Sequence, residues 1–569
     1  MFDTLPARAE PFLDWPWPDI EPYFQDLLER PLDASNVHAW LADWTRLSDL
    51  MIERHARLTL AVNLETTDKD AEARYDAYLD SVYPGSQAAN QRLKQKLLAS
   101  GLQPDNFAAP LRKMRAEAAL FRQSNLPLLT EEHKLTAQYN KIIGAQSVSW
   151  QGQELTLQQM RRALQTPDRA ARKHIWQIAA ERQLADRAAL NQLWSQYLDL
   201  RCKLAANADF PDYRAFRWQQ MLRLDYTPQD CLKFQKAIEQ VAVPAATRMY
   251  EKYRQRLGVE RLRPWDLDQD LYPLDLPPLP PYGSVSDLQD KVQGIFTRLD
   301  PQLGRYFQEM RAHGMLDLDN RKGKAPGAYC TAFPSTRRPF IFMNAVGLAS
   351  DVRTILHESG HAFHNFERLQ LPYTQQRLPG LEFSEVASMA MELLADPYVS
   401  REQGGFYDEA QARRFRLAHL EHLLAFWPYM AVVDAFQHWA YSRPDLSNSP
   451  RYCDAKWFEL WQRFMPGVDW SGLDAEAMTG WQRKQHIFRY PFYYVEYGLA
   501  QLGAVQVWHN ARQNPRRALK QYRRALGLGG TASLPELYKA AGARFAFDAR
   551  TLAQAVQFIE TAIATQSCA

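Results

Sequence analysis

Leu356-His357-Glu358-Ser359-Gly360-His361 is the most informative stretch of this chain, because it sets two imidazoles four residues apart with a carboxylate between them. On a helix, this spacing brings His357 and His361 onto one face, where neutral ring nitrogens can take two corners of a Zn²⁺ tetrahedron. Glu358 lies one step around the helix and can reach a water at the open position of the metal, which is the place of a general base. The stretch therefore predicts a zinc-hydrolase site on a helix.

A second helical pattern, residues 382–392, supplies candidates for the third metal ligand. It follows a loop with Pro372 and Pro379-Gly380, which lets the chain turn back antiparallel to the His helix. We predict Glu385 as the ligand, because two neutral histidines and one carboxylate leave a Zn²⁺ site with one net positive charge, which acidifies water. Glu392 shares the face of Glu385, and we predict that it orients a histidine; direct ligation is the alternative.

The patterning along the chain predicts a mainly helical fold. From about residue 35 to residue 205, apolar residues recur at helical spacing in segments rich in Ala, Leu, Gln, Arg and Glu, which indicates long antiparallel helices. Breaks such as Trp150-Gln151-Gly152-Gln153 predict turns between these helices. The clearest strand signals, residues 327–331 and 339–344, stand just before the His helix and predict a hairpin there. This small sheet can hold an extended substrate at its edge or only brace the helix.

Composition and charge limit the classes of partner. The chain has 569 residues, 46% of them hydrophobic, and a net charge of only +3, which indicates neither a nucleic-acid binder nor a polybasic membrane anchor. The longest apolar stretch, residues 423–433, is well short of the roughly 20 residues that a bilayer demands. The N-terminus shows no secretion signal, and the five cysteines are sparse and far apart. We therefore expect a cytoplasmic protein with no membrane span.

The length predicts more than one region. We place the boundary between an N-terminal helical region, residues 1–205, and a catalytic region, residues 206–569, that completes the site.

Residues 485–497 pack one histidine and four tyrosines into a short span. Such aromatic-rich runs often belong to a core, but buried phenol hydroxyls need partners. Tyr494 and Tyr497 lie three residues apart and can face one cavity if the segment is helical. A hydroxyl placed there can donate to the oxyanion of a tetrahedral intermediate, a role worth about 3 kcal/mol of barrier reduction.

These residues together resemble the M3 zinc oligopeptidases, especially the oligoendopeptidase F branch, with thimet oligopeptidase as a more distant relative. The resemblance spans most of the chain beyond about residue 110. The stretches that show it are His357-Glu358-Ser359-Gly360-His361-Ala362-Phe363-His364, residues 385–392, residues 327–329 and 339–344 leading into Asp351-Val352, residues 492–497, Asp212-Tyr213-Arg214, residues 225–228 and Pro264-Trp265-Asp266-Leu267.

The resemblance implies a two-lobed helical ellipsoid with a deep channel that admits short unfolded peptides. It implies one zinc ion per chain on His357, His361 and Glu385, with Glu358 activating water. The family's substrate-binding and oxyanion groups correspond to His486, Tyr490, Tyr494 and Tyr497, and we expect Tyr497 to meet the oxyanion. The thimet branch is glycine-rich in the corresponding segment, whereas this chain is bulky there and has Pro491.

The sequence thus predicts a zinc-dependent oligoendopeptidase that cleaves internal bonds of short peptides. A zinc carboxypeptidase of similar helical architecture is one alternative, because the ligand pattern is the same in both. A catalytically inactive peptide-binding scaffold is the other. The sequence does not predict the oligomeric state.

Overall fold

Long helices joined by short turns make up most of the chain in the computed structural model, which describes residues 1–267, 279–321, 323–325 and 327–568. The first half contains α1 Trp17–Glu29, α2 Val37–Leu64, α3 Lys69–Ser81, α4 Tyr83–Ala99, α5 Ala108–Leu120, α6 Leu126–Gly144, α7 Leu157–Ala163, α8 Arg169–Ala185, α9 Arg187–Asn207, α10 Tyr213–Gln220 and α11 Pro228–Leu257. The second half contains α12 Val285–Leu299, α13 Pro301–Ala312, α14 Ala349–Arg368, α15 Leu381–Ala395, α16 Glu409–Ser442, α17 Pro444–Ser447, α18 Pro450–Phe464, α19 Asp474–Met478, α20 Gln485–Arg489, α21 Tyr494–Gln513, α22 Pro515–Gly527, α23 Leu534–Ala540 and α24 Ala549–Cys568. The prediction of a mainly helical fold is confirmed.

A three-stranded sheet precedes α14. Strands β4 Tyr329–Phe333 and β5 Arg338–Ala345 form the predicted antiparallel hairpin, with Tyr329 opposite Phe342. The sequence did not predict β3 Leu316–Asp319, which pairs in parallel with β5 and makes the strand order β3-β5-β4. The central strand β5 packs against α14, so the sheet supports the helix that carries the two histidines.

One predicted turn between helices is instead the tip of a second hairpin. Strands β1 Ser147–Trp150 and β2 Gln153–Thr156 pair antiparallel around Gln151 and Gly152, whose φ angles are 51° and 78°. Positive φ at both central residues is the geometry of the tight hairpin turns that match strand twist. The turn was predicted at the right place, but the β-branched and aromatic residues beside it extend into strands.

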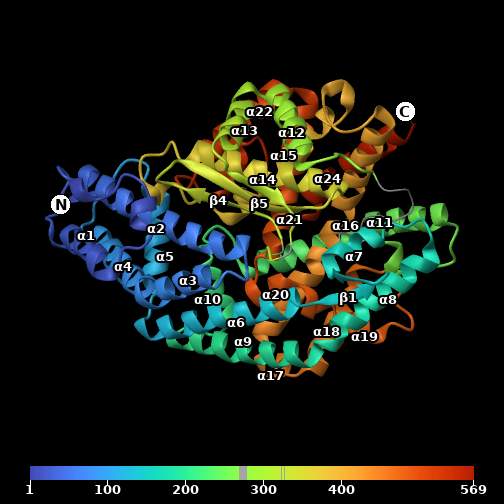
Figure 1. Ribbon diagram of the computed structural model, residues 1–569, viewed down its shortest axis with the longest axis horizontal. Helices are drawn as coiled ribbons and strands as arrows, with labels where there is room; N and C mark the ends of the chain where they lie inside the picture. The colour runs from blue at the N-terminus through green and yellow to red at the C-terminus, as the bar shows by residue number, and fades with distance from the viewer. Residues whose placement is uncertain (268–278, 322, 326, 569) are drawn as a thin grey trace.

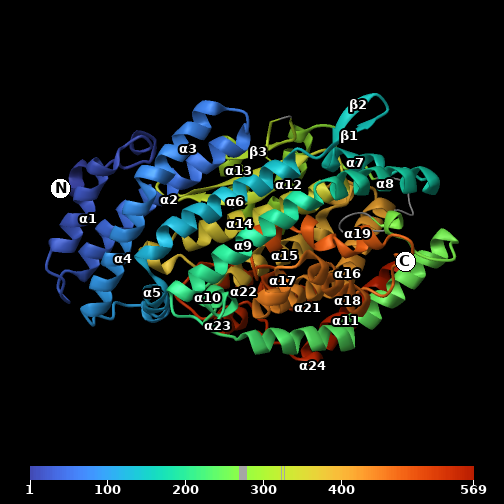
Figure 2. The ribbon, with the colours of Figure 1, turned by 90° about the horizontal axis from the view of Figure 1, so that it is seen from below.

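The described residues form two large hydrophobic cores. One contains side chains between Phe2 and Met114, and the other contains side chains between Leu120 and Ile563. Figures 1 and 2 show α1 to α5 gathered at one end of the molecule, while α14, α15 and α21 lie in its middle. The division at residues 205/206 stays a prediction. In the described part of the chain, no helix combines the length and apolar character that crossing a bilayer requires.

Asp351 fixes the start of α14. Its Oδ2 atom accepts hydrogen bonds from the backbone N–H groups of Val346, Gly347 and Leu348 at 2.7–2.9 Å. A carboxylate at this end satisfies N–H groups that have no partner within the helix and lies favourably in the positive end of the helix dipole. Asp351 therefore fixes the position along the chain at which α14 begins, ahead of His357.

Candidate metal centre

The candidate centre lies where α14 and α15 pack at unusually close range. A Cβ atom on Gly360 would come within 2.6 Å of the Ala387 carbonyl oxygen and of Ser388 Cα. Only glycine lets the two helices approach this closely at that level, one residue before His361. The close approach brings Glu385, on the first turns of α15, over the histidine face of α14.

His357, His361 and Glu385 form one group of ligating atoms, all within 4.8 Å of one another. The Oε2 atom of Glu385 lies 3.4 Å from Nε2 of His357 and 3.5 Å from Nε2 of His361. Two imidazole nitrogens and one carboxylate oxygen are the donor set of a zinc site that keeps a position open for chemistry. The three residues predicted as ligands are therefore brought together in an arrangement that fits Zn²⁺.

Glu358 lies beside this group and is 6% exposed. Its Oε2 atom has no hydrogen-bond partner among the described residues. Burial raises the pKa of the Glu358 carboxyl, and the nearby histidines oppose that shift. A buried carboxyl oxygen with no protein partner is unusual and is available for a water or a substrate group.

A chain of polar contacts continues behind His357. Its Nδ1 atom lies 2.7 Å from Oε1 of Glu392, and Oε2 of Glu392 lies 3.2 Å from Nε2 of His419 on α16. The other ring nitrogen of His419 lies 3.2 Å from Asp396. Burial opposes charge on His419, but Asp396 and Glu392 outweigh it and raise its pKa to about 9. Glu392 is thus placed to fix the ring orientation of His357, as predicted for it.

The tyrosine-bearing segment lies against the same group. Tyr493, which was not singled out from the sequence, donates a 2.6 Å hydrogen bond to Oε1 of Glu385. The ring centroid of Tyr497 lies 5.3 Å from that of Tyr493, 5.5 Å from that of Tyr494 and 5.7 Å from that of His486. The segment therefore places several hydroxyls and an imidazole in one cluster beside the candidate ligands.

The predicted site residues of this segment differ in their surroundings. Tyr494 is buried, and its hydroxyl accepts a 2.8 Å hydrogen bond from Nζ of Lys484. Tyr490 is 42% exposed, with its hydroxyl 3.0 Å from the Arg489 guanidinium. Burial lowers the pKa of His486 well below its ordinary value, so that its ring is neutral at pH 7. Tyr490 thus lies at the exposed rim of the cluster, and Tyr494 lies inside it.

Phe492 lies in the turn between α20 and α21, and the conformation of this turn sets the positions of the neighbouring tyrosines. Its φ of 64° is a left-handed conformation that a phenylalanine rarely adopts. Its carbonyl oxygen accepts a 2.5 Å hydrogen bond from Arg223, and its N–H donates to Gln437 at 2.7 Å. Arg223 is itself buried and pairs with Glu496 at 2.7 Å. Surrounding contacts over-determine the strained backbone, as is common at functional sites.

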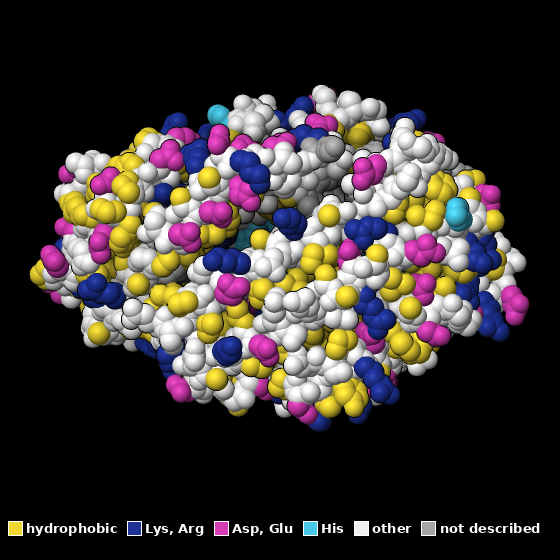
Figure 3. All heavy atoms as spheres, turned by 60° about the horizontal axis from the view of Figure 1, so that its bottom comes forward, with side chains coloured by type: hydrophobic (Ala, Val, Ile, Leu, Met, Phe, Trp, Pro, Cys, Tyr) yellow, Lys and Arg dark blue, Asp and Glu magenta, His cyan; other side chains and the backbone are white. Residues whose placement is uncertain are grey.

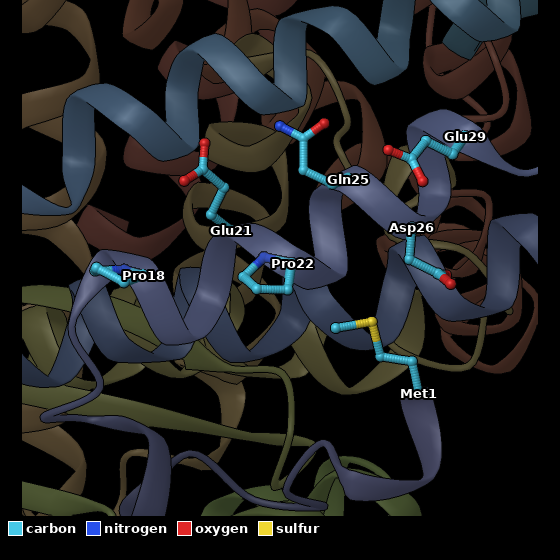
Figure 4. A pocket seen from close by; sticks show the side chains of 7 residues that line it. All are labelled: Met1, Pro18, Glu21, Pro22, Gln25, Asp26 and Glu29. Carbon is cyan, nitrogen blue, oxygen red and sulfur yellow. The ribbon is translucent and has the colours of Figure 1, made fainter.

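The molecular surface is hollowed over the middle of the structure. Figure 3 shows this hollow on one face, with a histidine side chain visible at depth inside it. A separate, shallow surface pocket on α1, shown in Figure 4, is lined by residues such as Met1, Pro18 and Glu29, and includes none of the candidate ligands. The α1 pocket therefore does not coincide with the candidate metal centre.

The fold and the site define a class of protein: a helical metallopeptidase with an HExxH helix and a glutamate contributed by the next helix. The profile of Peptidase family M3 matches residues 162–556, and the chain belongs to this family. M3 peptidases are zinc-dependent. The resemblance inferred from the sequence is therefore confirmed at the level of the family.

Individual relatives agree with this assignment. Oligopeptidase PepF of Bacillus subtilis (strain 168) is 24% identical over 251 residues, which cover 42% of this chain and 36% of that protein. PZ peptidase A has a structure similar to this one, with a TM-score of 0.90, 25% identity and 99% of both chains covered. A structure assigned as an oligoendopeptidase F is similar with a TM-score of 0.91, 26% identity and 99% and 98% coverage. The fold is thus shared over nearly the whole chain, although the match to PepF spans little more than a third of that protein.

Proposed function

We propose that this chain is a zinc-dependent oligoendopeptidase that hydrolyses internal bonds of short unfolded peptides. The observation that supports this most directly is the placement of the unpartnered Glu358 carboxyl beside the His357, His361 and Glu385 group. The family membership and the oligopeptidase among its relatives point the same way.

His357, His361 and Glu385 would hold the zinc ion. When bound, zinc supplies Lewis acidity, which polarises the peptide carbonyl and lowers the pKa of water. Glu358 takes the proton of the attacking water and later gives it to the leaving amine. The raised pKa of its carboxyl brings it closer to the range in which both transfers are efficient. Tyr497 donates its O–H to the carbonyl oxygen as negative charge develops there.

The peptide backbone would lie along β4. Among the described strands, β4 pairs only with β5, so its other edge has no strand partner. The strand packs against α14, the helix that carries the two histidines. Backbone pairing with such an edge binds extended peptides with little regard to side chains, which suits an enzyme of broad peptide preference.

The first test is product analysis. The purified protein is incubated with internally quenched short peptides, in matched pairs with free and amidated C-termini, with and without chelator. Mass spectrometry identifies the products. The proposal expects internal cleavage of both members of each pair and its loss with chelator, followed by recovery when Zn²⁺ is added back.

The other outcomes separate the alternatives. Stepwise loss of C-terminal residues from the free peptides only would identify a carboxypeptidase. Stoichiometric zinc without cleavage of any peptide would identify an inactive peptide-binding scaffold. Cleavage that chelator does not affect would contradict the metal-dependent mechanism altogether.

A further inference from the structure

A second group of metal-ligating side chains lies in the core and takes no part in the proposed peptidase chemistry. Cys231 comes from α11, and Asp434 and His438 come from α16, which packs against α11. Their ligating atoms all lie within 4.8 Å of one another. Cys231 and Asp434 are fully buried, and His438 is 4% exposed. Within the described residues, this and the candidate catalytic centre are the two such groups.

The geometry of this group repeats that of the candidate catalytic centre. Asp434 and His438 are four residues apart on one helix, as are the two histidines of α14, and a packed neighbouring helix supplies the third side chain in both places. The Nε2 atom of His438 lies 3.5 Å from Oδ2 of Asp434. The corresponding nitrogen-to-carboxylate distances at the catalytic centre are 3.4 and 3.5 Å. The second group is therefore equally well spaced to share one ion.

Several ligating atoms of the second group have no other partner. Within the described residues, neither ring nitrogen of His438 makes a hydrogen bond, and Oδ1 of Asp434 makes none. A neutral imidazole nitrogen without a hydrogen-bond partner can offer its lone pair to a metal. Buried polar atoms are rarely left unpaired, so three in one small cluster indicate a missing partner.

The local charge favours a cation as that partner. Asp434 accepts a 2.6 Å hydrogen bond from Gln235 but forms no ion pair with a lysine or arginine of the described chain. The nearby Arg223 is already occupied by Glu496 at 2.7 Å and Glu382 at 3.5 Å. The carboxylate charge of Asp434, which no lysine or arginine of the described chain pairs, favours a bound positive ion.

We propose that Cys231, Asp434 and His438 bind a second, structural Zn²⁺ ion that joins α11 to α16. One thiolate, one carboxylate and one neutral imidazole suit zinc, and the two negative charges balance the ion. On binding, the thiol of Cys231 gives up its proton to solvent as the sulfur–zinc bond forms. Gln235 holds the carboxylate in place from the outside.

This second site lies next to the tyrosine-bearing segment, residues 485–497, but it contains none of the proposed catalytic residues. The ring of His438 lies 5.3 Å from that of Phe492 and 5.9 Å from that of Trp218. Phe492 is the residue with the strained, left-handed backbone in the turn before Tyr493. A His438 ring fixed by the ion would therefore pack against the turn at Phe492.

Metal analysis of the full-length protein gives the first test. After loading with Zn²⁺ and gel filtration, the His357→Ala/His361→Ala variant lacks the catalytic ligands and should retain about one zinc per chain. Adding Cys231→Ser or His438→Gln to this variant should remove that zinc. Adding Cys453→Ala should leave it, because Cys453 is equally buried but belongs to no group of metal-ligating side chains among the described residues. Circular dichroism checks that each variant is folded.

Cobalt substitution identifies the sulfur ligand directly. The candidate catalytic centre offers only nitrogen and oxygen donors, so a thiolate-to-Co²⁺ charge-transfer band can arise only from a cysteine site. We expect this band in the protein loaded with Co²⁺ and in the His357→Ala/His361→Ala variant, and its loss with Cys231→Ser. Brief chelation should remove the ion from the more exposed catalytic site first.

The outcomes separate this inference from the proposed function. A folded His357→Ala/His361→Ala variant that holds no zinc and shows no thiolate band with Co²⁺ overturns the second site, whatever the peptidase assay shows. A band that persists in this variant supports the site even if no peptide is cleaved by the wild-type protein. If Cys231→Ser and His438→Gln both misfold, the band in the His357→Ala/His361→Ala variant still decides.

Discussion

At the scale of single residues, the proposed chemistry depends most on Glu358. Replacing Glu358 with Gln keeps the shape of the side chain but removes its basicity, so we expect kcat to fall by about 10²–10⁴-fold. Zinc content should stay unchanged, since the three ligands remain. Quenched-peptide kinetics and metal analysis measure the two quantities.

Glu367→Gln is the matched control on the same helix, because Glu367 pairs with Arg523 outside the site. A Glu358→Gln variant with near wild-type turnover would refute the general-base role.

Tyr493 and Tyr497 should have separable effects. Tyr497→Phe should lower kcat by about 10²–10³-fold with zinc affinity unchanged, because it removes one donor to the oxyanion. Tyr493→Phe should weaken zinc binding by about 10–100-fold, because the hydroxyl fixes the Glu385 carboxylate. Competition with a chelator measures zinc affinity, and the exposed Tyr452 provides a Tyr→Phe control. If Tyr493→Phe alone reduces kcat, the oxyanion role passes to Tyr493.

Residues within one helical turn were the easiest to predict from sequence. His357, Glu358 and His361 follow from helix geometry alone, and Glu385 needs only one loop that turns back. His419 and Tyr493 reach the same region through the packing of α16 and of the start of α21, and Arg223 reaches it from the turn between α10 and α11. No local pattern encodes these contacts. The Cys231, Asp434 and His438 group was not predicted for the same reason, because its two helices are far apart in the chain.

At the scale of elements, the close packing of α14 on α15 decides whether the ligands meet. Gly360→Ala would place a methyl group within 2.6 Å of the α15 backbone. We expect it to destabilise the protein by about 1–3 kcal/mol and to weaken zinc binding by moving His361 away from Glu385. Gly527→Ala is the control, because no atom lies within 4 Å of its added Cβ. Thermal unfolding and chelator competition provide the measurements, and equal behaviour of the two variants would refute the packing argument.

The small sheets show which elements a sequence pattern can specify. The β4–β5 hairpin was predicted from its own residues, because both strands are rich in aromatic and β-branched side chains. Strand β3 is only four residues long and joins the sheet in parallel with β5, a pairing that depends on the intervening loop and on α13. The β1–β2 hairpin was read as a turn between helices, because its strands are too short to show alternation clearly.

At the scale of the whole molecule, α2 of the N-terminal core contacts the segments that precede α14 and α15. Asp49 pairs with Arg377 at 2.8 Å in the loop before α15. Glu53 is fully buried, and its Oε2 accepts hydrogen bonds from the N–H groups of Ser335 and Thr336 at the tip of the β4–β5 hairpin. The N-terminal helices therefore brace the strand that we propose binds substrate.

Glu53→Ala tests this brace. Removing the carboxylate leaves the Ser335 and Thr336 N–H groups and the Arg57 guanidinium without their buried partner. We expect a local loss of about 1–3 kcal/mol, which corresponds to about 5–150-fold faster amide exchange at the hairpin tip, measured by hydrogen–deuterium exchange. Peptide kcat/KM should fall, because the edge strand is less ordered.

Glu10→Gln is the matched control, since Glu10 is an exposed partner of the same Arg57 and surface pairs contribute about 0–1 kcal/mol. Unchanged exchange at residues 335 and 336 in Glu53→Ala would show that α2 does not hold the hairpin.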